Sequence, residues 1–466
     1  MNGKCKAWVR CACAGMLMIS PALPGMAAPG AIAIEHVTIV PMTADGPETL
    51  GDETVVIENG RIVSIAPAKD AVIPKRTKRI DGAGKWLMPG LSDMHVHIMN
   101  DRAGRLYLRD PDLRDGTLRN EQIFMPFIAN GVTQLLDLQS MPETIGQRLQ
   151  IDTGHVLGPH LALAAMIDGE PAHWPLGMTR IAVAPEAGRQ AVRDIAADGY
   201  DFVKVYSSLT LETFTAIVDE ARKFHMRVVG HIPQRGQGIT EKFFQPGFDM
   251  VAHAEEFAQQ TEPAAPDAIP SYVEMAKRNN TWLDATLTLD DRLLEEVSHP
   301  ESLKARTEMR YLPEPFRGIV VDHNPYVARA DDAFIQHVRQ IVDFNRTLVR
   351  AFATAGIPVL SGTDSPVPGL APGFALHDEL EAMAAAGMTN RQVLEGTTRL
   401  ACQWLGVDGD RGTVEPGKRA DLLLLHADPL IDVANTRKIA GLFLGGRYLP
   451  KAELDRLLAA AFPHSP

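Results

Sequence analysis

Two histidines separated by a single residue close an apolar stretch and could bind a metal ion together. His95 and His97 end the segment 89–97, which reads Pro-Gly-Leu-Ser-Asp-Met-His-Val-His. Side chains two residues apart on a β-strand point to the same face, so the two imidazoles would converge on one point. Imidazole is a ligand of zinc and similar ions. Two ordinary histidines at a strand end give the same pattern, so the rest of the chain must decide between these interpretations.

Four later apolar runs also contain, or end in, a residue that can ligate a metal. Lys204 is unusual among them, because an ammonium group inside a dry strand is costly unless it is paired or neutralised. Each residue alone has a structural explanation. Asp364, for example, lies between Gly-Thr and Ser-Pro, where a helix cap would also fit. Taken together they favour a metal site. The four residues are Lys204, His231, His253 and Asp364.

The elements that must position these residues alternate between buried strands and helices. Eight apolar runs separated by helical patterns favour an α/β fold, a closed (β/α)8 TIM barrel. Catalytic residues of such barrels lie at the carboxyl ends of the strands, so the candidate ligands would meet at one mouth. An open doubly wound sheet is the alternative, but no Gly-x-Gly-x-x-Gly follows the first strand. The strands are predicted near residues 91–97, 131–139, 160–167, 202–207, 227–232, 249–253, 282–289 and 358–363.

Both ends of the chain are predicted to build a small β-sandwich beside the barrel. Short strand patterns flank Asn59-Gly60, a strong hairpin signal, and similar patterns return at 419–425 and 439–444. The proline-broken stretch 290–332 is interpreted as an inserted loop region over one face. The predicted domains are the β-sandwich of residues 29–86 plus 413–450, the barrel of residues 87–412, and a C-terminal helix and tail of residues 451–466.

The first 28 residues have the layout of a secretory signal peptide. Basic residues precede an apolar stretch that ends in Gly-Met-Ala-Ala, which is typical of a cleavage site. An uncleaved anchor is the alternative, although Pro21 and Pro24 interrupt a stretch that is short for a membrane span. We therefore expect export to the periplasm or secretion, without stable membrane insertion of the mature chain. Cleavage would leave Cys402 as the one cysteine and hence no internal disulfide.

Composition limits the classes of partner. The formal net charge is −12, and 45% of the residues are hydrophobic against 22% charged. These values are typical of a soluble globular protein, and the acidic balance argues against nucleic acid or an anionic membrane as the main partner. A small-molecule substrate is the expected partner, and a homo-oligomer is left open.

The ordered set of motifs resembles the amidohydrolase superfamily. The set comprises the segment 88–97 with both histidines, the lysine strand, the two later single histidines and Gly-Thr-Asp at 362–364. The β module matches as well, where the chain returns to it through the segment 412–422. Within the superfamily the chain is similar to the imidazolonepropionase-like and prolidase-like hydrolases. The segments that correspond to these enzymes after the eighth strand are 377–381, 387–389 and 396–398.

The resemblance implies two divalent metal ions, with zinc as the default and manganese, cobalt or iron also accepted by such ligands. Carboxylation of Lys204 by CO₂ would turn a costly buried cation into an anionic oxygen donor. A hydroxide between the ions would attack the scissile carbonyl, and Asp364 would carry its proton to the leaving nitrogen. A mononuclear deaminase is the alternative within the superfamily, but it would not need a bridging lysine. One ion would be held by His95, His97 and Asp364, the other by His231 and His253, with Lys204 between them.

Three residues are expected to contact the substrate. Tyr206 shares the inward face with Lys204 and lies nearer the opening, although a packed aromatic at the rim would also explain it. His173 follows the third strand, where prolidase-like relatives tend to have Gly-Gly-His, and this departure speaks against cleavage of dipeptides ending in proline. His377 begins the last helical segment and would either face the site or cap that helix.

We therefore predict a hydrolase that cleaves the amide bond of a small substrate, such as an N-acyl amino acid, a dipeptide or a cyclic amide. A lactone or ester hydrolase is the alternative, because the same hydroxide attacks either carbonyl. A catalytically inactive periplasmic binding protein is the third interpretation, which the presence of all six metal-site residues disfavours.

Overall fold

The computed structural model describes residues 30–108, 117–261, 264–318, 321, 324–367 and 369–463. The predicted signal peptide lies outside these residues, and so do the three cysteines of that segment. Cys402 is a free, buried thiol. None of the described helices is long and apolar enough to cross a membrane.

Eight parallel strands form the barrel that the sequence predicts. Neighbouring strands pair in chain order from the first to the eighth, and an extra short strand, β9 (Arg180–Ile181), pairs with the third. The barrel closes because the first strand also bonds to the segment of the last: Val96 bridges Ser365, and the Met94 N–H donates to the Ser361 carbonyl at 2.9 Å. The eight strands are β6 (Leu91–Val96), β7 (Val132–Asp137), β8 (His160–Asp168), β10 (Phe202–Val205), β11 (Val228–Gly230), β12 (Phe248–Ala252), β13 (Trp282–Asp284) and β14 (Val359–Leu360).

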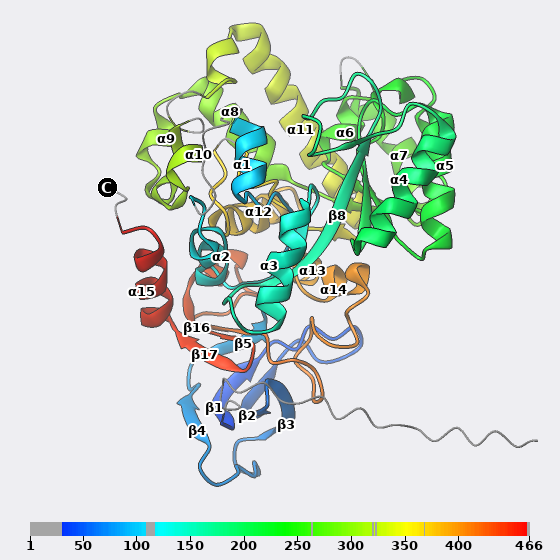
Figure 1. Cartoon of the computed structure of the whole chain (residues 1–466). Helices are drawn as coiled ribbons and strands as arrows, with labels where there is room; N and C mark the ends of the chain where they lie inside the picture. The colour runs from blue at the N-terminus through cyan, green and yellow to red at the C-terminus, as the bar shows by residue number, and fades with distance from the viewer. Residues whose placement is uncertain are drawn as a thin grey trace, which may run out of the picture.

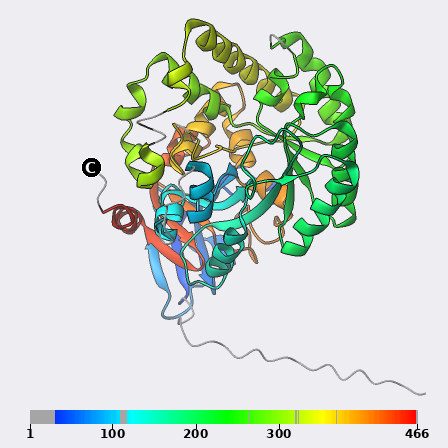
Figure 2. The same cartoon turned by 45° about the horizontal axis from the view of Figure 1, so that its top comes forward.

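Helices cover the outside of these strands (Figures 1 and 2). Helix α5 (Leu211–Lys223) shows why they form: the Thr210 hydroxyl accepts the Thr213 N–H at its start, and its buried residues include Phe214, Ile217 and Val218 on one face. The other covering helices are α2 (Asn120–Ala129), α3 (Pro142–Asp152), α4 (Pro185–Asp198), α7 (Ile269–Asn279), α11 (Asp332–Thr354), α13 (Asn390–Gly396) and α14 (Arg399–Leu405).

The stretch predicted as an inserted loop region is largely helical, and the prediction of loops there was wrong. The seventh strand ends at Asp284, earlier than predicted, and α8 (Leu287–Ser298) begins three residues later. The buried Glu379 carboxylate accepts the N–H groups of Leu287 and Thr288 at 3.0 and 2.7 Å. This replaces a cap from Thr286 at the helix start, whose side chain makes no capping bond and contacts His253 instead. Short helices follow, namely α9 (Ser302–Ala305), η4 (Thr307–Tyr311), α10 (Glu314–Arg317) and η6 (Val327–Arg329).

Further helices border the carboxyl ends of the strands. They carry residues that face the barrel mouth or support it. These helices are α1 (Asp101–Leu108), α6 (Glu255–Ala258) and α12 (Phe374–Ala385).

Both chain ends join in one β module beside the barrel (Figure 1). The link is the antiparallel pairing of β5 with β15, in which Leu87 lies opposite Leu424. Ile34 and Val55 from the first half pack with Leu422 and Phe443 from the second in one buried cluster. Helix α15 (Lys451–Ala461) follows the last strand. The strands are β1 (Ile32–Ile39), β2 (Leu50–Glu58), β3 (Arg61–Pro67), β4 (Lys78–Asp81), β5 (Trp86–Pro89), β15 (Leu422–Leu425), β16 (Ile439–Leu444) and β17 (Arg447–Pro450), and they form one hydrogen-bonded sheet.

Candidate metal centre

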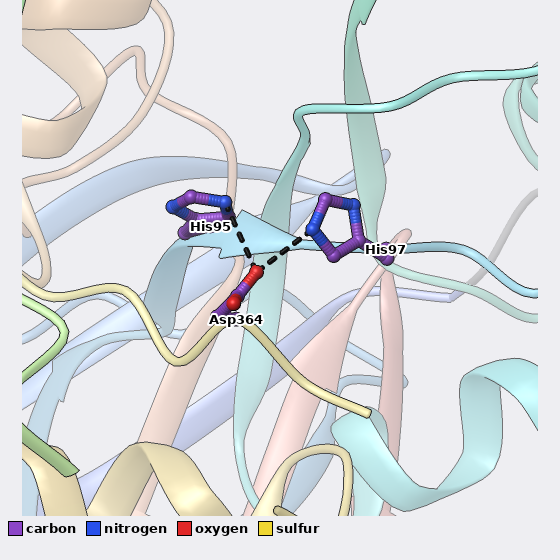
Figure 3. Close-up of side chains that lie close together, drawn as sticks. All are labelled: His95, His97 and Asp364. Carbon is purple, nitrogen blue, oxygen red and sulfur yellow. Dashed lines mark ion pairs between the residues drawn. The ribbon is translucent and has the colours of Figure 1, made fainter. Parts of the chain in front are cut away.

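Three predicted ligands lie together at the carboxyl end of the barrel. His95 belongs to β6, His97 directly follows that strand, and Asp364 follows β14, which lies next to β6 in the closed barrel (Figure 3). Oδ1 of Asp364 is 3.2 Å from Nε2 of His95 and 2.7 Å from Nε2 of His97. One ligand atom from each residue lies within 4.8 Å of the others, so this group could hold a metal ion.

Three atoms of this group are buried and make no hydrogen bond with a described residue. They are Nε2 of His95, Nδ1 of His97 and Oδ1 of Asp364. A buried polar atom without a partner costs about 1–3 kcal/mol, and such atoms call for an explanation. Nitrogen and carboxylate oxygen are both ligands of zinc and related ions, so a bound cation would satisfy Nε2 of His95 and Oδ1 of Asp364 at once. The donor set therefore fits a divalent metal.

Two further predicted histidines continue the group. The ring centroid of His253 is 4.4 Å from that of His95, and the ring of His231 is 5.1 Å from that of His253. Burial lowers the pKa of all three rings, and the charge of the nearby Lys204 lowers them further. Neutral imidazole is the form that binds metal ions, so burial favours ligation here.

Lys204 lies on β10 and has only 1% of its surface exposed. Burial lowers its pKa to about 8, and the charges of Asp364, Asp284 and Glu256 oppose that shift. The amine of Lys204 is therefore neutral in a substantial fraction of molecules near pH 8, which is the form that can react as a nucleophile.

Carboxylates and hydroxyls contact the second ring nitrogen of three of the four histidines. Nδ1 of His95 is 2.9 Å from Oδ2 of Asp284, and Nδ1 of His231 is 2.8 Å from Oε1 of Glu256. Nδ1 of His253 is 2.9 Å from the Thr286 hydroxyl. Such contacts orient a metal-binding imidazole and select its tautomer, leaving Nε2 free for the metal.

Sequence reasoning missed these supporting residues. Asp284 is the last residue of β13, the position at which the ligands occur on other strands, so the same rule could have found it. Glu256 follows His253 by three residues within α6, and no feature of the sequence distinguishes it from a surface glutamate. Both side chains are buried, which only the folded structure shows.

Two of the predicted substrate contacts lie beside the metal centre. The ring of Tyr206 lies tilted against that of His231 with centroids 4.0 Å apart, and the His173 ring lies edge-on to that of Tyr206 at 5.5 Å. Burial raises the pKa of Tyr206, so its hydroxyl stays protonated and able to donate a hydrogen bond. His173 is partly exposed, and its Nδ1 lies 3.2 Å from Oδ2 of Asp168.

The third predicted contact, His377, does not have a ring nitrogen available for a substrate. Nδ1 lies 2.9 Å from the Thr436 hydroxyl, and Nε2 lies 3.1 Å from the Asn130 carbonyl. The side chain is 1% exposed, inside α12 rather than at its cap. Its prediction as a substrate contact is therefore corrected: His377 ties α12 to the end of α2 and to the segment before β16.

Two tyrosines that the sequence did not single out also approach the mouth. Burial raises the pKa of Tyr107 to about 12 and raises that of Tyr326, and the charge of Asp364 contributes to both shifts. The charge of Asp364, a candidate ligand, therefore acts on both phenols. Tyr107 belongs to α1, and Tyr326 directly precedes η6.

Comparison with known proteins gives a consistent result. The sequence profile of the amidohydrolase family matches residues 86–449. An imidazolonepropionase from Ralstonia nicotianae is 23% identical over 426 residues, covering 86% of this chain and 92% of that enzyme. An imidazolonepropionase from Stenotrophomonas maltophilia is 34% identical over 64 residues, which are 14% of this chain and 16% of that enzyme.

Among solved structures, a candidate prolidase from Bifidobacterium longum has a TM-score of 0.68 to this chain at 25% identity. The match covers 94% of this chain and 100% of that protein. The (β/α)8 barrel with its β module and the resemblance to the imidazolonepropionase-like and prolidase-like branch are thereby confirmed. The family profile covers more than half of the chain, and the chain therefore belongs to the amidohydrolase family, whose members are hydrolases of carbon–nitrogen bonds and generally use divalent metal ions.

Proposed function

We propose that this protein is a binuclear metal-dependent hydrolase that cleaves the amide bond of a small substrate. The observation that carries the proposal is the buried group of His95, His97 and Asp364, in which two ligand atoms lack hydrogen bonds. His253 and His231 continue this group through ring contacts, which supports a second ion held beside the first.

The ligands would be divided between two ions. His95, His97 and Asp364 would hold one, and His231 and His253 would hold the other. When bound, such ions lower the pKa of water and polarise a carbonyl, and zinc is the default choice for these donors.

Lys204 is the group that would join the two halves of the centre. Its neutral amine would attack CO₂, forming an N–C bond and releasing one proton, and the product is an anionic carbamate. The low pKa of Lys204 supports this step, because only the neutral amine has the free electron pair. The negative charge would also remove the cost of burying an ammonium.

Asp364 is the group that would move the proton. Burial raises its pKa, but the ion pair with His97 and the charges of His253 and Lys204 outweigh that effect and hold the pKa below its usual value. The carboxylate is therefore ionised and can take the proton of the attacking water, then pass it to the leaving nitrogen. The protonated hydroxyl of Tyr206 lies beside His231 and would donate a hydrogen bond to the substrate.

Metal analysis of the purified protein tests this proposal. The wild type should contain about two divalent ions per chain, and a chelator should abolish hydrolysis that returns on adding metal. Lys204→Ala should lose both metal and activity, whereas Lys277→Ala, which changes an exposed lysine on α7, should keep both. Wild-type protein that stays metal-free after folding with metal supplied would contradict the proposal.

A hydrolysis screen then assigns the bond that is cleaved. N-acyl amino acids, dipeptides, cyclic amides and lactones should be compared at equal concentration. Turnover of amides is expected, and turnover of lactones alone would replace the amide assignment with a lactonase. The same preparations test the proposed export, because protein recovered from the periplasm should begin near residue 28 or 29, as determined by N-terminal sequencing.

A further inference from the structure

His97 differs from the other candidate histidine ligands at its second ring nitrogen. Nδ1 of each of the other three contacts a carboxylate or a hydroxyl, whereas Nδ1 of His97 is buried and makes no hydrogen bond with a described residue. Nε2 of His97 lies 2.7 Å from Oδ1 of Asp364, so this nitrogen faces the candidate metal site. A neutral imidazole that binds a metal through Nε2 carries its proton on Nδ1, and that proton almost always has an acceptor. An acceptor for His97 is therefore still to be assigned.

Asp137 has a carboxylate oxygen that no described donor uses. The side chain is fully buried, and Oδ2 receives no hydrogen bond from a described residue. The Ser140 hydroxyl is close to this carboxylate and lowers its pKa, yet its hydrogen bond of 3.0 Å goes to the backbone carbonyl of Asp137. A buried acceptor without a donor is costly, so Oδ2 calls for a partner just as Nδ1 of His97 does.

The fold places this carboxylate against the backbone at His97. Asp137 is the last residue of β7, and it lies opposite Val96 in the parallel pairing of β6 with β7. Oδ1 of Asp137 accepts the N–H of Ile98 at 3.4 Å, and Ile98 is bonded directly to His97. The same oxygen accepts the N–H of Gln139 at 3.2 Å. Because Nδ1 is the ring nitrogen nearer to the backbone of its own residue, Nδ1 of His97 and Oδ2 of Asp137 lie in one buried region.

The two side chains also interact through their charges. Burial raises the pKa of Asp137 to about 6, and the charge of His97 is the largest effect that opposes this rise. The two atoms are not bonded to each other directly, since each lacks a hydrogen-bond partner among the described residues. Buried water molecules typically join polar groups that are left in this way, and such a bridge is nearly as favourable in enthalpy as a direct hydrogen bond.

We propose that Asp137 is the positioning residue of His97, which accepts the proton on Nδ1 through a bridging water molecule and so holds Nε2 toward the metal ion. The inference rests on the proposed function for the presence of that ion. Asp137 would contact neither the metal nor the substrate, and its effect would pass through the His97 ring. It would complete the set of groups that orient the four histidines, namely Asp284, Glu256 and Thr286 for the other three.

Asp137→Asn separates this role from a structural one. The amide oxygen can still accept the N–H groups of Ile98 and Gln139, while the NH₂ group takes the place of Oδ2 and cannot accept a proton from the direction of His97. The metal-free variant should therefore melt at a temperature no lower than that of the wild type. Its metal affinity, measured by chelator competition, should fall by about 10–100-fold, the range found for groups that orient metal-binding histidines.

Asp249→Asn is the matched control. Asp249 lies near the amino end of β12, at the opposite end of the barrel from the candidate metal site, and its carboxylate accepts the N–H of Val228 at 2.9 Å. This variant replaces a carboxylate that also accepts a backbone N–H on a neighbouring strand, so it should keep the wild-type metal affinity. Wild-type affinity in folded Asp137→Asn, or an equal loss in Asp249→Asn, would overturn the proposal.

Nitrogen NMR of protein labelled with ¹⁵N-histidine reads the tautomer without depending on activity. In the zinc-loaded wild type, His97 should carry its proton on Nδ1, and its signals are assigned as those missing in His97→Gln. The Nδ1 signal should move in Asp137→Asn and stay in place in Asp249→Asn. A wild-type His97 ring protonated on Nε2 and bound to zinc through Nδ1 would overturn the proposal, even if Asp137→Asn failed to fold.

These measurements distinguish failure of this inference from failure of the proposed function. Zinc binding without amide hydrolysis would contradict the proposed function, while the affinity and the NMR signals would still decide the role of Asp137. If the wild type bound no metal, the proposed function would fail, and the metal-free protein would decide this inference. Its His97 Nδ1 signal should still move in Asp137→Asn, and an unchanged signal would overturn the assignment of Asp137.

Discussion

Asp284 should control the metal affinity of this protein, although it is not predicted to touch the metal. Its carboxylate is fully buried, and Oδ2 lies 2.9 Å from Nδ1 of His95. Asp284→Ala would leave that N–H buried without an acceptor, which costs about 1.5–3 kcal/mol for a hydrogen bond to a charged group. This corresponds to a loss of about 10–100-fold in metal affinity, the range found for groups that orient metal-binding histidines.

Asp284→Asn should have a smaller effect, because the amide oxygen can still accept from His95. A loss of about tenfold is expected from the missing charge alone. The site has no room for a larger residue, since a Cβ placed on Gly362 would lie 2.2 Å from Oδ1 of Asp284, so the isosteric asparagine is the suitable replacement.

The metal-free protein should respond in the opposite way. Burial raises the pKa of Asp284 well above its usual value, and the charges of Glu379 and Asp93 raise it further. A carboxyl whose pKa is raised on folding destabilises the folded state at pH values above its pKa in the unfolded chain. Metal-free Asp284→Asn should therefore melt at a temperature no lower than the wild type, while its metal affinity falls.

Chelator competition measures the affinity, and thermal melting of the metal-free protein measures the stability. Asp421→Asn is the control, because Asp421 forms a similar buried contact with Nε2 of His160, at 2.9 Å, where β8 begins. It should leave the metal affinity unchanged. Wild-type affinity in folded Asp284→Ala, or an equal loss in Asp421→Asn, would refute the reasoning.

Three further results are expected. Reconstitution of metal-free protein with bicarbonate and metal should accelerate by about tenfold per pH unit below pH 8 and level off above it, because Lys204 loses its proton near that pH; a rate independent of pH would contradict its carboxylation. His377→Ala should lower the free energy of unfolding by about 2 kcal/mol in denaturant titrations without changing KM, since both ring nitrogens serve structural hydrogen bonds. Asp364→Asn should reduce kcat by about 100-fold or more in steady-state assays, because the amide cannot accept the proton of the attacking water; retained kcat would assign proton transfer to another group.

Much of the barrel could be predicted because its strands are buried on both faces. Such strands produce continuous apolar runs, and the run 202–207 contains the observed strand β10 (Phe202–Val205). Lys204 stands out in that run because a cation in an apolar strand is physically costly. The alternation of strands and helices then predicts a shared mouth, because parallel strands all end on the same side of a barrel.

The prediction failed where a partner distant in the sequence decides the local structure. Residues 285–289 continue an apolar run, yet the chain turns into a helix, because Glu379 caps it from 91 residues away. His377 resembled a candidate for the site, but Thr436 and Asn130 occupy its nitrogens. Neither pairing has a local signal.

The types and order of the candidate ligands are properties of the sequence, since strand periodicity sets which side chains face inward and each strand end carries its own residue. The support of these ligands depends on the tertiary structure. Asp284 reaches His95 across 189 residues, and Glu256 reaches His231 across the gap between two strands. Contacts of this kind follow from barrel closure, which brings the first and last strands together and which no local pattern encodes.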